Sequence, residues 1–233
     1  IVKYIYEIGK KENIETKQLW LESLPADIYL SDLRKKYNYK PIPSLVNPII
    51  GEFDLPSKQT QGLLNLDLTH EGNTLIYGQS GSGKENLLAT ILFSIVSENT
   101  PSDVNIYIID LGAETLQMFR KMPHVGGVLG IDDFDKIIDL FTMVDDEMTR
   151  RKELFSDYGG SFTTYNESNA NKEPLIVIII NGYDNFSESF SRIEDGIQNF
   201  IRDGAKYGVV FIVTTITASA VRGRMLQYFN HKI

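Results

Sequence analysis

The sequence contains no cysteine, and no apolar run is long enough to cross a membrane. The absence of cysteine excludes disulfides and thiolate metal sites, and it is compatible with any cellular compartment. A membrane-spanning helix needs about 18 to 20 apolar residues. The nearest candidate, Val209–Val221, is interrupted by several Thr and one Ser. The chain begins at Ile1 and has no signal-peptide pattern, so we expect a soluble piece of a longer protein.

Basic residues are also in short supply. The 23 Lys and Arg are outnumbered by 31 Asp and Glu, which gives the 233-residue chain a formal net charge of -8. Proteins that bind nucleic acid generally rely on positive charge to contact phosphates, so this balance disfavours a nucleic-acid partner. A content of 42% hydrophobic and 23% charged residues is ordinary for a folded globular protein.

The pattern along the chain predicts an N-terminal arm, residues 1–50, that packs on a larger domain, residues 51–233. Within the arm, Ile28–Leu30 is predicted to be a short strand, and three prolines exclude a helix near residues 41–48. The larger domain alternates strands with helices, which is typical of an α/β fold with a mostly parallel sheet. Its strands are expected at Asn73–Tyr77, Val104–Ile109, Gly127–Gly130, Leu175–Ile180 and Val209–Thr214. Its helices are expected at Lys84–Glu98, Thr115–Met122, Asp132–Tyr158 and Glu188–Lys206, with Gly159–Pro174 as an exposed loop.

A phosphate-binding loop is predicted at the turn Gly78-Gln79-Ser80-Gly81-Ser82-Gly83-Lys84. It matches G-x-x-x-x-G-K and stands between a strand and a helix, which is the context that this motif requires. Glycines allow backbone N–H groups to converge on phosphate oxygens, and the lysine reaches the outer phosphates. We therefore predict a P-loop NTPase fold.

The next residue departs from the motif. Glu85 stands where a Ser or Thr normally binds Mg²⁺. A carboxylate about 5 Å from a phosphate oxygen repels it by about 3 kcal/mol at an effective dielectric constant of about 20. Two interpretations stay open: Glu85 acts as a built-in anion at the helix N-terminus, or it turns outward and has little effect.

A second departure follows the apolar strand Leu175–Ile180. In an active P-loop ATPase this strand ends in an acidic residue associated with Mg²⁺, often followed by a catalytic Glu. Here it ends in Asn181 and Gly182, neither of which can do acid–base chemistry. Asp184 is interpreted as a solvated loop acid rather than a displaced substitute. The sequence therefore predicts weak or absent ATP and Mg²⁺ binding and negligible hydrolysis, with no catalytic residue and no metal site. The histidines do not alter this: His124 is expected to be packed, and His70 and His231 lack metal-ligand spacing.

Several segments together resemble the FtsK/SpoIIIE-type ATPases of type VII secretion systems. They are Gly72–Gly78, Ile106–Gly112, Met122–Val128, Glu147–Arg151 before Phe155, and Trp20-Leu21 with Leu24-Pro25. The resemblance implies one of three tandem ATPase-like modules on the cytoplasmic side of a membrane-anchored coupling protein. The degenerate motifs favour the C-terminal module of the three, with the second module as the alternative.

The resemblance also assigns expected roles to particular residues. Active relatives carry a sensor Gln where Ile216 stands here, so a γ-phosphate sensor is lacking. Arg222 and Arg224 lie where a basic residue could face a neighbouring module, although surface arginines are the commoner interpretation. The chain stops at Ile233, where a further strand is expected. The abundance of Asn, Lys and Tyr predicts a low-GC Gram-positive source.

Three functions compete at this point. The first, which the sequence favours, is a degenerate module that recognises exported helical-hairpin proteins and regulates adjacent modules. The second is an active translocation motor in which Glu85 and Asp184 replace the usual metal ligands. The third is a DNA translocase, which the acidic charge disfavours.

Overall fold

The computed structural model describes residues 1–12, 14, 21–112, 114–221 and 223–233. Its centre is a six-stranded sheet in the order β5-β4-β6-β7-β3-β8, in which every pair of neighbours is parallel. The strands are β3 (Thr74–Tyr77), β4 (Val104–Asp110), β5 (Val125–Leu129), β6 (Leu175–Asn181), β7 (Val209–Thr215) and β8 (His231–Lys232). The α/β fold with a parallel sheet, predicted from the sequence, is confirmed.

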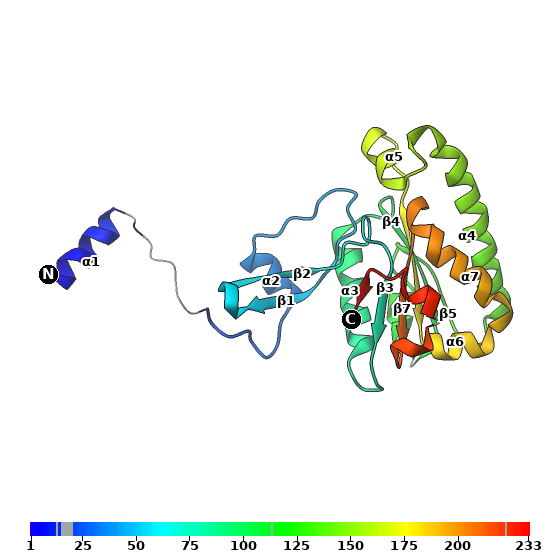
Figure 1. Cartoon of the computed structure of the whole chain (residues 1–233), viewed down its shortest axis with the longest axis horizontal. Helices are drawn as coiled ribbons and strands as arrows, with labels where there is room; N and C mark the ends of the chain where they lie inside the picture. Colours follow the sequence, from blue (N-terminus) through cyan, green and yellow to red (C-terminus); the bar gives the residue numbers. More distant parts are fainter. Residues whose placement is uncertain (13, 15–20, 113, 222) are drawn as a thin grey trace.

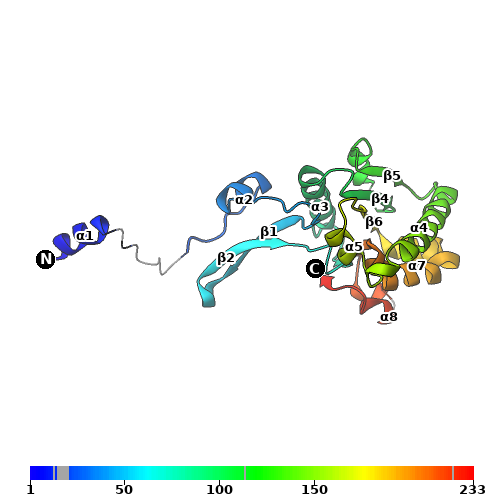
Figure 2. The same cartoon turned by 90° about the horizontal axis from the view of Figure 1, so that it is seen from above.

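Helices cover both faces of this sheet (Figures 1 and 2). One face packs on α3 (Lys84–Glu98) and α5 (Phe162–Ser168). The other packs on α4 (Phe134–Leu154), α6 (Tyr183–Ser189), α7 (Ser191–Asp203) and α8 (Gly223–Leu226). All seven residues of β6 are buried. The six residues Leu175–Ile180 alternate between the two hydrophobic clusters, because successive strand side chains point to opposite faces.

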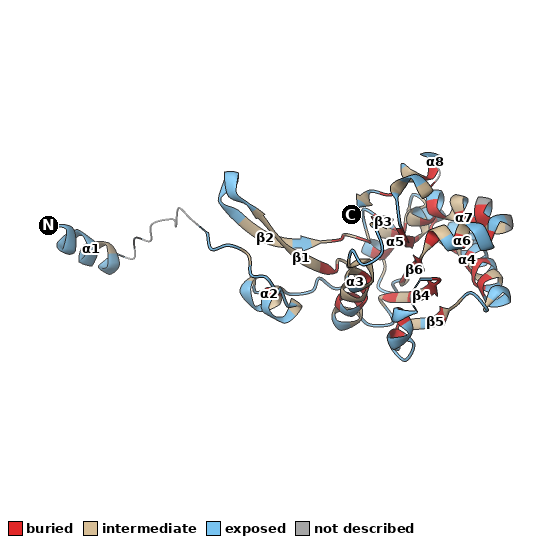
Figure 3. Cartoon of the chain, turned by 90° about the horizontal axis from the view of Figure 1, so that it is seen from below, coloured by how far each residue is buried: buried red, intermediate tan, exposed pale blue. Residues whose placement is uncertain are grey.

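The N-terminal segments lie to one side of the sheet. Helix α1 (Val2–Lys11) contains no buried residue, whereas α2 (Leu30–Lys36) buries Leu33. Farther along, Val46 joins the hydrophobic core under α3. A two-stranded antiparallel hairpin follows, made of β1 (Ile49–Leu55) and β2 (Thr60–Asn65). Figure 3 shows burial concentrated around the sheet and little of it in α1. The division of the chain at residue 50 stays a prediction.

Four predicted elements are wrong in kind or extent. Residues 28–30 form no strand, because Tyr29 is the extended N-cap of α2. The predicted loop at 159–174 contains α5, whose Phe162 and Tyr165 pack on Phe155. The predicted helix at 115–122 is a 3₁₀-helix that ends at Phe119.

The fourth error concerns the predicted helix at 188–206, which is divided between α6 and α7. The break is at Phe190, which is the C-cap of α6 and the N-cap of α7. Its ring is buried and stacks on Phe134 and Phe186, so tertiary packing fixes the non-helical backbone there. The hairpin of β1 and β2 was not predicted at all.

Candidate functional site

The predicted phosphate-binding loop lies at the carboxyl-terminal edge of the sheet, between β3 and α3 (Figure 1). Gly81 and Gly83 have φ angles of 78° and 93°, which only glycine adopts without strain. A side chain at Gly78 would meet the Ser82 hydroxyl at 2.6 Å. The loop therefore keeps the backbone shape that the motif G-x-x-x-x-G-K predicts.

Lys84 is folded back onto its own loop. Its ammonium group donates a hydrogen bond to the Gly78 carbonyl oxygen. The side chain is half-buried and lines a cavity of about 330 Å³ at the strand ends. The cation that would meet the outer phosphates is therefore engaged with the protein backbone.

Glu85 lines the same cavity. Its neighbours around the wall come from the phosphate-binding loop and from the ends of β4, β6 and β7; the lining residues are Ser80, Lys84, Glu85, Gly112, Asn181, Gly182, Asp184, Asn185, Thr214, Thr215 and Ile216. The two interpretations of Glu85 that the sequence leaves open both stay predictions. Its carboxylate lies in the first turn of α3, where the positive end of the helix dipole favours an anion.

Asn181 is held in a buried hydrogen-bond network at the centre of the sheet edge. Its side-chain amide donates to the Asp110 carboxylate over 2.8 Å, and its side-chain oxygen accepts from the Thr214 hydroxyl over 2.7 Å. Thr214 in turn accepts from the backbone N–H of Gly182 over 2.9 Å. Both ends of the Asn181 side chain thus have hydrogen-bond partners within the protein, and these bonds fix its orientation.

The Asp110 carboxylate is 1% exposed and completes this network. It also accepts from the backbone N–H groups of Gly112 and Leu116, at 3.3 and 3.1 Å. Parallel pairing of β4 and β6 sets Asp110 directly beside Asn181. The sequence interpretation assigned no role to Asp110 or Thr214. Their common signal is a polar residue at the end of a buried strand, where parallel strand ends meet at one edge.

Asp184 is not the solvated loop acid that the sequence suggested. Its carboxylate accepts hydrogen bonds from the Thr215 hydroxyl, at 2.9 to 3.0 Å, and from the Ile216 backbone N–H at 2.9 Å. These bonds tie α6 to the end of β7 and place a second carboxylate on the cavity wall.

The remaining predicted residues lie at the rim or away from it. Ile216 lines the cavity and is 48% exposed, so an apolar side chain occupies the position of the expected sensor. Arg224 is an exposed residue of α8. Arg222 and Trp20 lie outside the described residues. His124 is packed, as predicted, and its Nε2 is 2.9 Å from the Asn99 carbonyl oxygen.

The site fits one part of a Mg²⁺–nucleotide complex and not the other. The glycine loop provides a backbone cradle for a phosphate, in keeping with the motif. The metal half does not fit, because Glu85 replaces the usual hydroxyl and the neutral Asn181 replaces the usual acidic residue. Among the described residues there is no cluster of three or more His, Asp or Glu side chains suited to a metal ion.

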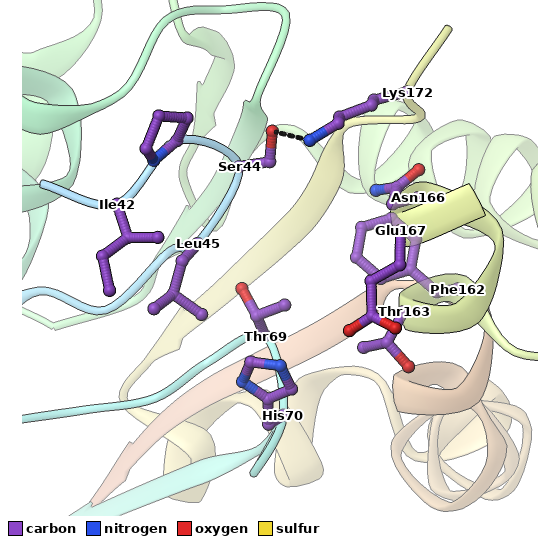
Figure 4. A pocket seen from close by; sticks show the side chains of 11 residues that line it. Ile42, Ser44, Leu45, Thr69, His70, Phe162, Thr163, Asn166, Glu167 and Lys172 are labelled. Carbon is purple, nitrogen blue, oxygen red and sulfur yellow. Dashed lines mark hydrogen bonds between the residues drawn. The ribbon is translucent and has the colours of Figure 1, made fainter. Parts of the chain in front are cut away.

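A second, more apolar cavity of about 390 Å³ lies where strands begin, beside the segments that lead into β3 and β6 (Figure 4). One wall is the arm segment 42–45 with the turn 69–70, and the opposite wall is α5. A hydrogen bond of 2.9 Å from Lys172 to Ser44 joins the two walls at one end. This cavity is at the edge of the sheet where strands begin, whereas the phosphate-binding loop is at the edge where strands end.

None of the helices among the described residues is long and apolar enough to span a membrane. This finding agrees with the absence of a long apolar run in the sequence.

Comparison with known proteins gives consistent relatives. The chain is 28% identical over 236 residues to the ESX secretion system protein EccC of Geobacillus thermodenitrificans, with all of this chain and 15% of that protein covered. It is 28% identical over 242 residues to the type VII secretion system protein EssC of Staphylococcus aureus, covering all of this chain and 16% of that protein. The chain thus spans about one sixth of the length of these relatives.

Solved structures give the same result. ATPases 2 and 3 of Geobacillus thermodenitrificans EssC superpose with a TM-score of 0.79 at 26% identity, over 91% of this chain and 40% of that one. A Thermomonospora curvata EccC structure (ATPases 2 and 3 in complex with a signal sequence peptide) has a TM-score of 0.74 at 23% identity. That likeness covers 82% of this chain and 36% of the other and concerns the fold alone. Finally, the profile of the FtsK/SpoIIIE family matches residues 39–230, so the chain belongs to the FtsK/SpoIIIE family.

Proposed function

We propose that this chain is a degenerate ATPase module of a type VII secretion coupling protein. It binds ATP weakly or not at all, hydrolyses little or none, and acts by recognising exported proteins and regulating adjacent modules. The observation that carries the proposal is the cavity at the phosphate-binding loop. Among the described residues that line it, two acidic residues, Glu85 and Asp184, accompany one basic residue, Lys84. The named relatives EccC and EssC support the setting in type VII secretion.

Electrostatics opposes a nucleotide in this cavity. A polyphosphate at the loop would meet the Glu85 carboxylate at the position where Mg²⁺ is normally bound. Each close pair of like charges costs about 3 kcal/mol at 5 Å and an effective dielectric constant of about 20. Lys84 offsets this only after its bond to Gly78 is broken. Binding is therefore expected to be weak even though the loop backbone retains its shape.

The setting of the whole protein follows from the same relatives and is part of the proposal. The module is on the cytoplasmic side of the cell membrane of a Gram-positive bacterium and is attached through the rest of a longer chain. Its partners are adjacent ATPase modules and exported helical-hairpin proteins. The net charge of -8 disfavours DNA, and DNA binding that persists at physiological salt would support a DNA translocase instead.

The decisive substitution is Glu85→Thr, which restores a hydroxyl next to Lys84. Isothermal titration with ATP and Mg²⁺ should detect an affinity at least about tenfold higher than in the native chain, since about 3 kcal/mol of repulsion is removed. Glu188→Gln is the matched control, because it removes the same charge from an exposed position of α6 outside the cavity. Steady hydrolysis by the native chain that Lys84→Ala abolishes would refute the degenerate module.

An active motor is the second candidate, and one observation favours it: Glu85 and Asp184 line the same cavity and offer carboxylate oxygens, which Mg²⁺ accepts. The two candidate functions predict opposite changes in ATP affinity for Glu85→Gln. If Glu85 holds a metal, the substitution lowers Mg²⁺-dependent ATP affinity and phosphate release. If Glu85 repels phosphate, the substitution raises ATP affinity.

For recognition of an exported segment, we propose the cavity of Figure 4. Ile42, Leu45 and Phe162 give it an apolar lining, and charged side chains stand at its rim, as in pockets that take an apolar anchor residue. Ile42 is 61% exposed, so Ile42→Asp should leave the fold intact while weakening binding of a purified helical-hairpin substrate by at least about tenfold. The control is Ile131→Asp, which changes another exposed isoleucine outside this cavity. Equal binding by both variants would exclude this cavity as the recognition site.

A further inference from the structure

Asn181 and Gly182 form the one Asn-Gly pair in the sequence, and this pair is chemically labile. Because glycine has no side chain to shield its backbone nitrogen, that nitrogen can attack the side-chain carbonyl carbon of the preceding asparagine. The new N–C bond closes a succinimide ring, and the side-chain nitrogen leaves as ammonia together with the proton of the glycine N–H. Water then cleaves one of the two C–N bonds of the ring, which gives aspartate or isoaspartate. The reaction needs no reagent other than water.

In the folded chain, hydrogen bonds hold each of the atoms that would react. The Gly182 backbone N–H, which is the nucleophile, donates to the Thr214 hydroxyl over 2.9 Å. The same hydroxyl donates to the Asn181 side-chain oxygen over 2.7 Å. The nitrogen that would leave as ammonia donates to the Asp110 carboxylate over 2.8 Å. Thr214 thus joins the nucleophile to the carbonyl group that it would attack, and holds both in place.

The backbone geometry also opposes ring closure. Asn181 is the last residue of β6, where it pairs with Asp110, and its carbonyl oxygen accepts from the Leu111 N–H over 2.9 Å. Ring closure requires rotation about the bond between the Asn181 Cα and its carbonyl carbon, which turns the Gly182 N–H away from Thr214. The bond from Gly182 to Thr214 must therefore break before the reaction can begin.

The fold requires the glycine that makes the pair labile. Gly182 has a φ angle of 88°, in the left-handed region that other residues adopt only with strain. A Cβ atom at this position would lie 3.2 Å from the Leu111 carbonyl carbon. The turn from β6 into α6 therefore depends on glycine directly after Asn181.

Water has access to the site. Asn181, Gly182 and Thr214 all line the cavity of about 330 Å³ at the strand ends. Asn181 is 2% exposed, whereas Gly182 is half-buried. The water that opens the ring can therefore reach the wall of the cavity without separation of the central strands.

We propose that Asn181 is a deamidation site and that its two neighbouring hydrogen bonds to Thr214 set the rate. The opening that permits reaction is confined to Gly182 and the last residue of β6. The aspartate product carries an acid where active P-loop ATPases have one, and this acid meets the Asp110 carboxylate. The isoaspartate product adds a methylene group to the backbone and disrupts the pairing with Asp110. The reaction does not involve ATP, so the inference stands independently of the proposed function.

Peptide mapping by mass spectrometry measures the reaction in the full chain during incubation at pH 8. The product is recognised by the mass change from amide to acid at residue 181, and an isoaspartyl methyltransferase assay identifies the isoaspartate form. The reference rate is that of the same chain unfolded in urea. We expect the folded chain to react at least about tenfold more slowly than this reference, because reaction requires local opening.

Two matched substitutions in β7 test the role of Thr214. Thr214→Val removes the hydroxyl that bonds to Asn181 and Gly182, and should speed the reaction in the folded chain by at least about tenfold. Thr215→Val makes the same change one residue later, where the hydroxyl bonds to the Asp184 carboxylate, and should leave the rate unchanged. Equal rates in the two variants would overturn the proposal.

The native chain supplies a test that does not depend on the folding of a variant. Local opening exposes little surface, so the rate should stay nearly constant in urea concentrations below the unfolding transition. A rate that rises with urea as steeply as the unfolded fraction would show that global unfolding is the only route, contrary to the proposal. A folded chain that reacts as fast as the unfolded reference, or in which residue 181 stays unmodified throughout, would also overturn it.

Discussion

At the scale of single residues, Asn181 is more than a lost metal ligand. Asn181 is paired with Asp110 in the register of β4 and β6, and its side-chain amide donates a hydrogen bond to the buried Asp110 carboxylate. An aspartate at this position would instead bring two carboxylates within 2.8 Å of each other. The neutral residue therefore stabilises the strand ends in the presence of Asp110.

This arrangement predicts that Asn181→Asp destabilises the protein. Loss of the buried hydrogen bond and repulsion between the carboxylates should lower the free energy of unfolding by about 2 to 4 kcal/mol, measured by urea denaturation at pH 7. Asp110→Asn combined with Asn181→Asp should recover most of the loss, because one donor again faces one carboxylate.

The double variant also isolates the coupling between the two positions. A free energy of unfolding equal to the sum of the single effects would show that Asp110 and Asn181 act independently, contrary to the prediction. If the exchange succeeds, the carboxylate introduced by Asn181→Asp accepts from the Thr214 hydroxyl and from the amide introduced by Asp110→Asn. Gly182 still supplies no acid–base group beside it. Restoration of this single acid should then leave ATP hydrolysis negligible.

At the scale of helices and strands, long periodic segments could be predicted and short ones could not. The apolar run of β6 and the helical spacing of α3 define these elements locally, and the structure has α3 at Lys84–Glu98, as predicted. By contrast, α5 has only seven residues and is held by Phe162 and Tyr165 packing on Phe155, a contact that no local pattern reveals. The division of α6 from α7 likewise depends on the burial of Phe190.

The candidate site divides in the same way. The glycine loop and Lys84 are consecutive, so their position and shape could be predicted from a motif. The network around Asn181 depends on the meeting of separate strand ends. Asp184 was misinterpreted because its partners Thr215 and Ile216 are about thirty residues away. Sequence spacing alone carries no information on such contacts.

Helix α4 carries a pH-dependent contact at its C-terminal end. Hydrogen bonds from Arg150, and then from Arg151, lower the pKa of Glu147 from 4.5 to about 2. Since the pKa is lower in the folded protein, this contribution is fully present above the unfolded value and is lost as the pH falls from about 4.5 towards 2. The buried Arg151 depends on the same carboxylate.

We therefore expect Glu147→Gln to lower the free energy of unfolding by about 1 to 2 kcal/mol at pH 7, a reduced figure because Glu147 is partly exposed. The difference from the native chain should shrink below pH 4.5 as Glu147 itself becomes protonated. Urea denaturation at a series of pH values measures this difference in the free energy of unfolding. Glu153→Gln, an exposed substitution on the same helix, should show no such convergence. A difference that stays constant down to low pH would contradict the role of the ion pair.

At the scale of the whole molecule, stability is unevenly distributed along the chain. The sheet and its covering helices form two hydrophobic clusters, one on each face, whereas α1 buries nothing. Amide groups in such a helix exchange through local opening, and amide groups in a fully buried strand such as β6 exchange only when the domain unfolds. The amide groups of α1 and those of β6 should therefore differ by orders of magnitude in their rates of hydrogen exchange.

Hydrogen exchange read by mass spectrometry measures this difference. In dilute protein, amides of α1 should exchange nearly as fast as in an unfolded peptide, while those of β6 should be the slowest. Protection of α1 that is already complete in dilute solution would instead mean that the helix is stabilised within its own chain.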